Sequence, residues 1–294
     1  MDSDGDSGTP LASFEAKWSA AHPEFGLALK FVAARERAAQ GAFACLVFEL
    51  EQAAFATPDA EPAAIKLQWW AEELTRAGRG EARHPLTREL AGRREFVAVP
   101  IAQWRDVVAG AFAQRDRAPA ADGAAVLDRY ADFHRPLGTI EAALFKADAA
   151  ATIRALSGMR ALRDLVALPQ VLQGGNLPLP LGVLARHRLV RGDLSRPSRA
   201  RSQAVGDWLR ELACCLDGTS RRRTGPGALA GSPHAGGGAP HPAVFRSAMA
   251  AVLARRARRA ARAEDPLATL AASAGSLTLS DAWAAWRAGR RSLR

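Results

Sequence analysis

Apolar residues recur at helical spacing along most of the chain, and this pattern predicts a protein built of helices. Between residues 25 and 51, for example, Phe43, Val47 and Leu50 fall on one stripe of a helix. Further helices are predicted over residues 65–77, 124–145, 149–172 and 202–216, and others begin near Pro85 and after Pro100. Polar, Gly-rich or Pro-rich stretches separate several of these segments.

Two segments interrupt the helical pattern. Pro178 and Pro180 in "GGNLPLPLGVL" exclude a regular helix at that point. Residues 217–241, "DGTSRRRTGPGALAGSPHAGGGAPH", are too long for an ordinary connector and are predicted to form a flexible loop. We therefore expect a disordered tail over residues 1–20, a helical domain over residues 21–216, the flexible loop over residues 217–241 and, over residues 242–294, C-terminal helices of the same domain.

The composition supports an all-α fold. Alanine is abundant while Val, Ile and Thr are sparse, and this balance favours helix over sheet. No apolar run reaches the roughly 18 residues that a membrane-spanning helix needs, and the acidic start "MDSDGDSGTP" is unlike a signal peptide. Cys45, Cys214 and Cys215 lack metal-ligand spacing and suit a reducing setting. We therefore expect a cytoplasmic protein, either fully soluble or peripheral to the inner membrane.

Arginine carries nearly all of the net charge of +10. Its planar guanidinium suits phosphate and diphosphate groups, and a basic chain is also attracted to an anionic membrane surface. A bias toward Ala, Arg and Gly explains the same composition without any function. The most basic helix, "ARRARRAARAED" over residues 254–265, lacks the aromatic partners that favour nucleic-acid binding. We expect no nucleic acid as a partner; a solvated helix ranks first, and contact with a membrane surface or an acidic partner ranks second.

The segment "AIKLQWWAEELTRAGRGEARHPLTREL", residues 64–90, combines aromatic and acidic side chains on one predicted helix. Trp69 and Trp70 point about 100° apart on such a helix, so they cannot make the same contact. Glu72 and Glu73 lie on the flanks of its apolar stripe. Two interpretations follow. The tryptophans are core residues with solvated glutamates beside them, or the segment is part of the wall of an active site.

This segment resembles the part of squalene/phytoene synthase-family proteins in which an "LQWWR-E" helix leads into an "HP" turn and another helix. The resemblance continues in the same order along the chain. It includes "YADFHRPLGTIEAAL" (residues 130–144), "RALRDLVALPQVLQGGNLPLPLGVLARHRL" (residues 160–189) and the closing "AWAAWRAGRRSLR". Together these segments extend from about residue 25 to the end of the sequence, apart from the Gly/Pro-rich loop.

The resemblance implies an all-α isoprenoid-synthase fold, a single helical domain around a central apolar cavity. In active members of the family, two farnesyl or geranylgeranyl diphosphates join head to head. Aspartates on two facing helices hold Mg²⁺, which binds the diphosphate leaving group. Hard carboxylate oxygens at i and i+4 lie on one helix face and suit this metal, which neutralises the departing diphosphate.

This chain departs from the family at both aspartate motifs. At the first motif it has Glu49 and Glu51, and side chains at i and i+2 point to different sides of a helix. At the second motif, the two alignment registers place either Ala167 and Val171 or Asp164 and Leu168 at the aspartate positions. Because neither register provides two acids, the sequence predicts that the metal platform is lost at both motifs.

Residues retained around the cavity could still contact a ligand. The pocket candidates are Glu49, Trp69, Trp70, Glu72, Glu73, Tyr130, Arg163 and Asp164. The six histidines show no zinc-binding spacing, and no dinucleotide-binding or P-loop motif is present. No residue is assigned a catalytic role. We expect no metal or other cofactor, with Mg²⁺ required only if the protein is an active enzyme.

Three hypotheses remain open. The first is a catalytically degenerate relative that acts as a prenyl-ligand-binding or assembly factor, as in the family's branch of mitochondrial complex I assembly factors, which also lack the full aspartate set. The second is an active Mg²⁺-dependent head-to-head prenyl transferase, and the third is an unrelated helical interaction protein. The partners expected under the first two are a prenyl diphosphate or other apolar ligand, a protein partner, and a membrane surface on which the protein lies peripherally.

Overall fold

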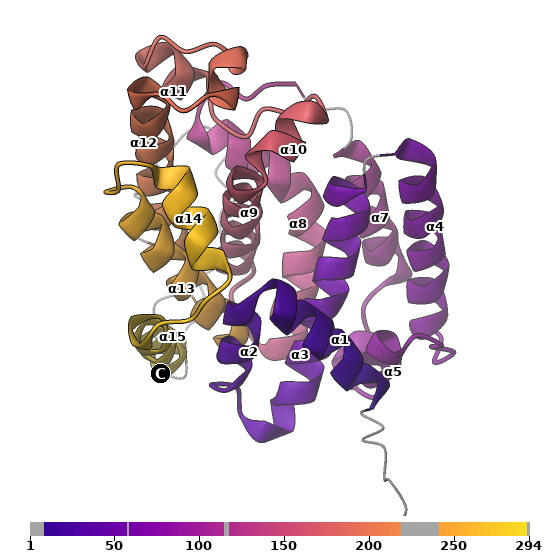
Figure 1. The fold of residues 1–294 in the computed structure, drawn as a ribbon. Helices are drawn as coiled ribbons and strands as arrows, with labels where there is room; N and C mark the ends of the chain where they lie inside the picture. The colour runs from indigo at the N-terminus through magenta and orange to yellow at the C-terminus, as the bar shows by residue number, and fades with distance from the viewer. Residues whose placement is uncertain (1–8, 58, 115–117, 219–240, 293–294) are drawn as a thin grey trace, which may run out of the picture.

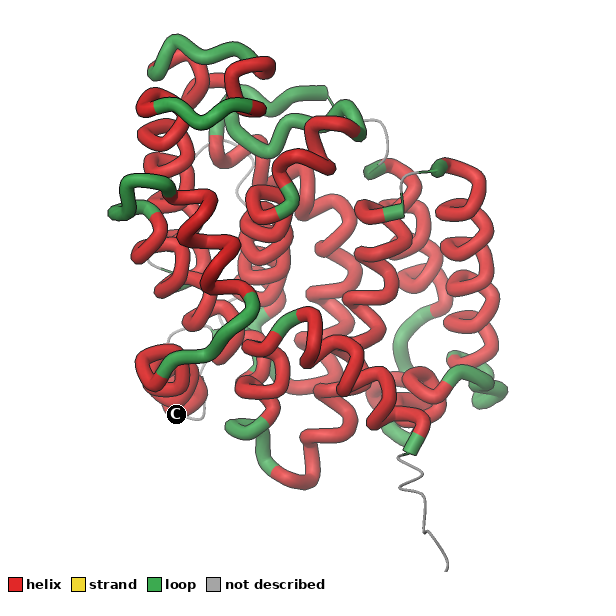
Figure 2. Tube along the Cα trace, viewed as in Figure 1, coloured by secondary structure: helices red, strands yellow, loops and turns green. Residues whose placement is uncertain are grey.

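The computed structural model describes residues 9–57, 59–114, 118–218 and 241–292. Within these ranges the chain forms helices joined by loops and no β-strand (Figure 2), which confirms the all-α prediction. The elements are α1 (Pro10–Ala21), α2 (Pro23–Leu29), α3 (Ala34–Glu51), the π-helix η1 (Gln52–Ala56), α4 (Ala60–Ala77), α5 (Pro85–Ala91), α6 (Arg94–Val97), α7 (Ile101–Ala113), α8 (Gly123–Phe145), α9 (Ala149–Val166), α10 (Leu168–Gln173), α11 (Leu181–Arg186), the 3₁₀ helix η2 (Arg191–Ser195), α12 (Arg199–Leu216), α13 (Val244–Ala260), α14 (Pro266–Ala274) and α15 (Leu279–Ser292).

Helices α8 and α9 pack side by side in the middle of the molecule (Figure 1). On one side α7 packs on α8, and α4 packs on α7. On the other side α12 and α13 pack on α9 and on each other, and α15 covers α13. Figure 1 shows α1, α2 and α5 at the lower end and α10 and α11 at the upper end. Segments from both halves of the sequence therefore surround the central pair.

Glycine allows α8 and α9 to approach closely. A Cβ atom added at Gly138 of α8 would lie 2.6 Å from Cγ1 of Ile153 and 3.2 Å from its backbone nitrogen. Both distances are shorter than ordinary van der Waals contact, and the second involves backbone that cannot rotate away. The separation of the central helices thus depends on the missing side chain at this position.

Buried ion pairs tie the C-terminal helices to the rest of the domain. Arg246 of α13 donates to Glu141 of α8, with 2.7 Å between Nη2 and Oε2, and both side chains are buried. Arg256, also on α13, donates from Nη1 to Glu24 of α2 over 2.9 Å. The predicted loop over residues 217–241 lies outside the described residues except at residues 217, 218 and 241.

Residues 1–8 of the predicted tail lie outside the described residues, whereas residues 10–20 belong to α1, which corrects that part of the prediction. Thr9 caps this helix by accepting from the backbone N–H of Ala12, and Pro10 fits its first turn. The side chain of Trp18 is buried against the core. Leu11, Phe14 and Trp18 follow the i, i+3, i+7 spacing of one helix face, so the local sequence does favour this helix.

Candidate functional site

A pocket of about 300 Å³ lies among α1, α2, the end of α3 with η1, α9, α13 and α14. Its apolar lining comes mainly from Trp18, Phe48, Leu162, Leu253 and Leu270. Charged groups enter the same space from several directions: Glu24, Glu51, Arg160, Arg163 and Arg256 also line it. The pocket thus combines an apolar surface with a small set of charged side chains, as ligand sites usually do.

Stacked aromatic rings form one wall of this central pocket. The Trp18 and Phe48 ring centroids are 4.8 Å apart, and His22 stacks on Phe48 at 4.9 Å. The Arg163 guanidinium lies 5.0 Å from the Phe48 ring centroid, within the range of a cation–π contact. Burial, together with the nearby Arg163 charge, lowers the pKa of His22 to about 4. This imidazole is therefore neutral at pH 7 and adds no positive charge to the wall.

Glu51, the last residue of α3, is a buried acid in the pocket lining. Its side chain pairs with Arg163 of α9, with 2.5 Å between Nη2 and Oε2, and it lies 2.9 Å from Nε2 of His134 on α8. Burial by itself would raise the pKa of Glu51, but the Arg163 charge and the His134 hydrogen bond outweigh it and lower the pKa to about 2. The carboxylate is ionised and already neutralised by a cation from the protein.

Asp164 of α9 is buried next to the pocket. Tyr130 of α8 donates its hydroxyl to one carboxylate oxygen, and Arg160, one turn earlier on α9, donates to the other. The guanidinium of Arg160 also lies 4.8 Å from the ring of Phe55 in η1. Asp164 is thus enclosed by two donors, and only its arginine partner reaches the pocket lining.

These pairings decide whether the residues fit Mg²⁺. Magnesium is bound through carboxylate oxygens that are free to coordinate it. Here Glu51 faces Arg163 and Asp164 faces Arg160, so each acid has a positive charge where a metal ion would lie. Among the described residues, no group of three or more His, Cys, Asp or Glu side chains could hold a metal ion. The donor set of the pocket does not fit the metal that the fold family implies.

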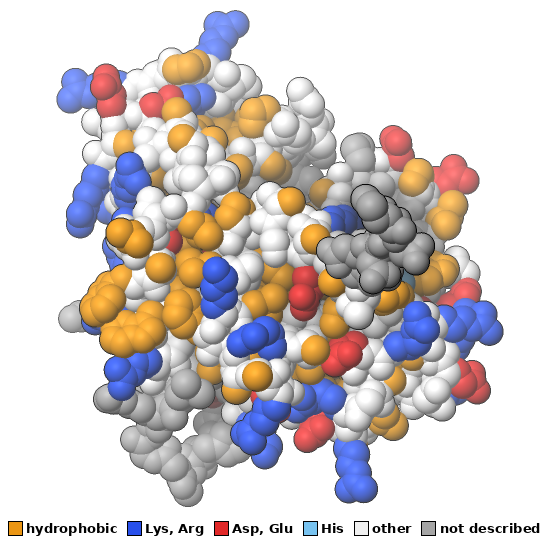
Figure 3. Space-filling model, turned by 60° about the horizontal axis from the view of Figure 1, so that its bottom comes forward, with side chains coloured by type: hydrophobic (Ala, Val, Ile, Leu, Met, Phe, Trp, Pro, Cys, Tyr) orange, Lys and Arg blue, Asp and Glu red, His pale blue; other side chains and the backbone are white. Residues whose placement is uncertain are grey.

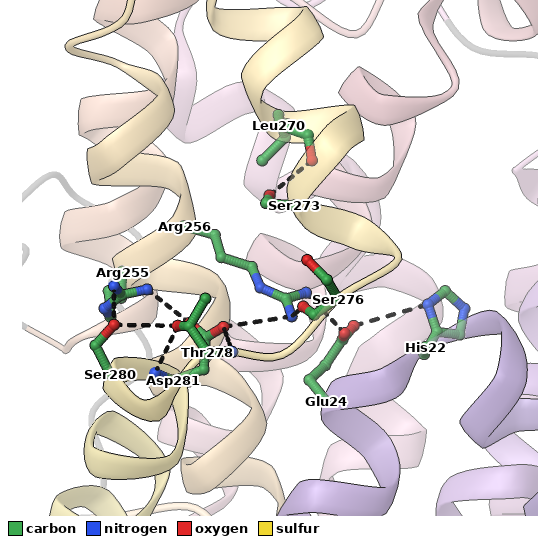
Figure 4. A network of polar contacts seen from close by, with 10 residues as sticks. All are labelled: His22, Glu24, Arg255, Arg256, Leu270, Ser273, Ser276, Thr278, Ser280 and Asp281. Atoms are coloured by element: carbon green, nitrogen blue, oxygen red, sulfur yellow. Dashed lines mark hydrogen bonds and ion pairs between the residues drawn. The ribbon is translucent and has the colours of Figure 1, made fainter.

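A second network closes the pocket on its α13 side (Figure 4). Arg256 donates from Nη1 to Glu24 and from Nη2 to the backbone oxygen of Ser276, the latter over 2.7 Å. The same Nη2 lies 3.7 Å from Asp281 of α15. Arg255 in turn donates to Asp281 over 2.7 Å. The acids and arginines are matched here as well, so this edge offers no unpaired carboxylate.

The structure brings together only part of the candidate set from the sequence. Arg163 lines the central pocket, and Tyr130 and Asp164 are linked to it through Arg160, which pairs with Asp164. Trp69 and Trp70 line a different, surface groove of about 630 Å³ beside α1, α4 and α5. Neither tryptophan contributes to the lining of the central pocket. Trp70 is buried, whereas Trp69 is 44% exposed.

The three remaining candidates also lie away from the central pocket. Glu49 lines the surface groove and binds Lys17 and Lys66. Glu72 is exposed and pairs with Arg76 on its own helix.

Glu73 holds the turn after α4. It accepts from the hydroxyl of Thr87 and from the backbone N–H groups of Arg83 and His84. Burial opposes ionisation of Glu73, but these hydrogen bonds outweigh it and lower its pKa.

The candidate set from the sequence lacks several residues of the pocket lining, and it also lacks His134, a partner of the lining residue Glu51. Arg160 stands four positions before Asp164, a spacing that places both side chains on one helix face and could have identified the pair. His134 and Glu51 come from segments 83 positions apart, so no local pattern links them. Arg256 belongs to the basic helix that was interpreted as solvated, yet it is buried.

Comparisons with solved structures identify the fold. A dehydrosqualene synthase in complex with a ligand matches with a TM-score of 0.66 and 12% sequence identity, over 97% of this chain and 96% of that chain. Squalene synthase HpnC from Alicyclobacillus acidocaldarius matches with a TM-score of 0.55 and 14% identity, over 71% of this chain and 81% of that chain. No model of a protein family and no curated protein sequence matches the chain. The chain therefore has the all-α isoprenoid-synthase-like fold of squalene synthases, as predicted.

Proposed function

We propose that this protein is a catalytically degenerate form of the squalene synthase fold, which binds one apolar, prenyl-like ligand in the central pocket and acts as a binding or assembly factor. The observation that carries the proposal is the pairing of two buried acids with arginines, Glu51 with Arg163 and Asp164 with Arg160. An acid that must recruit Mg²⁺ for ionisation of a diphosphate needs its oxygens free. Here they are already occupied.

The size of the pocket supports a single ligand. Its volume of about 300 Å³ is at the lower end of the range of about 300–1,000 Å³ for small-molecule sites. Head-to-head condensation needs two prenyl chains to lie together, which calls for a larger cavity. The aromatic wall of Trp18, His22 and Phe48 and the leucines opposite it suit one hydrocarbon chain.

The charges at the pocket also favour an uncharged or weakly anionic ligand. Glu24, Glu51, Asp164 and Asp281 offset Arg160, Arg163, Arg255 and Arg256 one for one. Because each positive charge is paired with a negative one, the pocket has no strong positive potential that would attract a diphosphate. An alcohol or hydrocarbon of the prenyl class therefore fits at least as well as a prenyl diphosphate.

The test combines a turnover assay with a binding assay. Diphosphate release is measured with purified protein, Mg²⁺ and farnesyl or geranylgeranyl diphosphate, and farnesyl diphosphate and farnesol are compared as ligands by thermal shift. Ala167→Phe places a large side chain at the pocket lining. Ala185→Phe, on the exposed side of α11, is the matched control. We expect no release, thermal stabilisation by farnesol, loss of that shift in Ala167→Phe, and an unchanged shift in Ala185→Phe.

Other results would favour the remaining hypotheses. Mg²⁺-dependent release of diphosphate that Ala167→Phe abolishes would mean that the protein is an active prenyl transferase and that the paired acids rearrange on substrate binding. Absence of both turnover and ligand stabilisation would leave an assembly role that uses the surface of the fold and not its pocket.

A further inference from the structure

Helix α15 has an inverted distribution of side chains. The residues that it buries against the domain are Asp281, Ala285, Ala288 and Gly289. Its largest apolar side chains face outward instead: Leu279 is 92% exposed, Trp283 59% and Trp286 36%. A helix at the edge of a soluble domain normally directs its apolar stripe toward the core. In α15 the small residues occupy that side, and the tryptophans are left on the surface.

Basic side chains share the outward surface with these residues. Trp283, Trp286, Arg287 and Arg290 follow the i, i+3, i+4, i+7 spacing of one helix face. The two indole rings lie 4.7 Å apart, and the guanidinium of Arg290 lies 5.2 Å from the Trp286 ring. We call this surface, made by Leu279, Trp283, Trp286, Arg287 and Arg290, the α15 face.

The domain holds the α15 face in its outward orientation. Thr278 and Asp281 cap the helix reciprocally, because the backbone N–H of each is bonded to the side chain of the other, over 3.0 and 3.2 Å. Asp281 is also held by Arg255 (Figure 4). A Cβ at Gly289 would lie 3.4 Å from Cβ of Phe31, so the inner side of α15 already packs closely. The tryptophans therefore have no space to turn inward.

Figure 3 shows the molecule with its lower end turned forward. On this view of the lower end of the molecule, hydrophobic side chains gather at the left side, and Lys and Arg side chains border them. Contiguous exposed apolar surface in a soluble domain usually marks an interaction site. Arg291, exposed next to the α15 face, adds to the positive charge at this end of the helix.

We propose that the α15 face docks the protein on the surface of an anionic lipid membrane. Tryptophan prefers the membrane–water interface, where its ring contacts lipid and its N–H remains hydrated. An amphipathic helix with Trp and Leu beside Arg lies in the plane of that interface, and arginines bind anionic headgroups. The net charge of +10 attracts the whole chain to the same surface. No helix in the described ranges is both long and apolar enough to cross a bilayer.

Helix α15 also contacts the lining of the central pocket, on its buried side. Arg256 lines the pocket and lies 3.7 Å from Asp281 in the first turn of α15. Membrane docking does not depend on which ligand the pocket binds, so it can be tested without that ligand.

The test measures co-sedimentation of the full-length protein with two kinds of vesicle, phosphatidylcholine alone and phosphatidylcholine mixed with phosphatidylglycerol. Trp283→Ala with Trp286→Ala removes the apolar part of the α15 face. Trp69→Ala, at an indole that is 44% exposed on α4, is the matched control. Wild type should bind the mixed vesicles. The double variant should bind them at least about tenfold more weakly, because it lacks the two indoles that contact lipid. Trp69→Ala should bind as wild type does.

Charge reversal separates electrostatic attraction by the α15 face from the effect of net charge. Arg287→Glu and Arg290→Glu should each weaken binding to the mixed vesicles about fivefold or more. Arg105→Glu, at an exposed position on α7, changes the net charge equally and should have a much smaller effect. Thermal melting of every variant verifies that the domain is folded.

Three outcomes would overturn the proposal. The first is that wild type binds neither vesicle. The second is that Trp69→Ala weakens binding as much as the double variant does. The third is that wild type forms a dimer that the double variant loses while neither form binds vesicles, which would assign the α15 face to a second copy of the chain.

Discussion

A buried carboxylate such as that of Glu51 is tolerated only when a partner offsets its lost hydration. Arg163 is the charged partner, and His134 adds a hydrogen bond. His134 is itself kept neutral, because its burial lowers its pKa more than Glu51 raises it. Glu51 is therefore held by one cation, Arg163, and one neutral donor, His134. Removal of Arg163 should destabilise the fold more than removal of His134 does.

We predict that Arg163→Ala destabilises the fold by about 3–5 kcal/mol, the usual loss when one partner of a buried ion pair is removed. Chemical denaturation measures the change in free energy of unfolding. Glu51→Leu combined with Arg163→Met removes both charges while keeping similar volume, and it should be less destabilising than Arg163→Ala alone. A loss below about 1 kcal/mol for Arg163→Ala would mean that the pair behaves like an exposed salt bridge.

The same pair makes stability depend on pH. The pKa of Glu51 falls from 4.5 to about 2 in the folded protein. A lowered acid pKa stabilises the fold above the unfolded value, and this contribution disappears as the pH falls from about 4.5 through 2. The shift corresponds to a contribution of about 3 kcal/mol.

Glu51→Gln removes this ionisable group. Between pH 4.5 and 2, the variant should therefore lose about 3 kcal/mol less unfolding free energy than wild type does. The measurement is the free energy of unfolding between pH 2 and 6. Glu72→Gln, at an exposed glutamate on α4, is the control and should follow wild type. An unchanged slope in Glu51→Gln would mean that another group causes the acid transition.

At the scale of elements, the close contact of α8 and α9 depends on Gly138. Alanine favours helix over glycine by about 1 kcal/mol, but overpacking costs about 1–3 kcal/mol when the surrounding atoms cannot move. Because the backbone of Ile153 lies 3.2 Å from the added Cβ, we expect overpacking to dominate and Gly138→Ala to lower the melting temperature. Gly275→Ala, where no atom lies within 4 Å, should leave it nearly unchanged. A more stable Gly138→Ala variant would show that α9 can shift at little cost.

The spacing of apolar residues predicted the long helices well. It did not predict the positions at which a helix breaks or changes its hydrogen-bonding pattern. The helix predicted over residues 124–145 agrees with α8 to within a residue. The one predicted over residues 149–172 is divided at Ala167, and Pro169 lies in the first turn of the separate helix α10, which begins at Leu168. The π-helix η1, which follows Glu51 at the pocket, leaves no signal in the spacing of apolar residues.

The site was less predictable than the fold for a physical reason. The sequence shows Glu51 and Asp164 as single acidic residues. Whether either could bind a metal ion depends on the cation that it pairs with in the fold. Arg160 is near Asp164 in sequence, whereas Arg163 and His134 reach Glu51 only through the packing of α3, α8 and α9. The tryptophan pair illustrates the opposite case. Trp69 and Trp70 mark the family resemblance clearly, yet they line a separate groove.

At the scale of the whole molecule, α13 links the C-terminal helices to the central helix α8, which is far away in sequence. Its Arg246 and Glu141 of α8 form a pair in which both side chains are almost completely buried. Neither group can recover its hydration without local opening, so the pair stabilises the contact only while both members are present. The C-terminal helices and the central pair should therefore unfold together.

We predict that Arg246→Ala lowers the free energy of unfolding by about 3–5 kcal/mol, since it leaves Glu141 buried without its cation. The transition should remain single, with tryptophan fluorescence and far-ultraviolet circular dichroism giving the same midpoint, because α13 also packs on α9, α12 and α15. Arg105→Ala, at the exposed α7 position, should change stability by less than about 0.5 kcal/mol. Two separate midpoints in wild type would contradict the argument, because the C-terminal helices would then form an independent unit and the pocket between them and α1–α3 could open without unfolding.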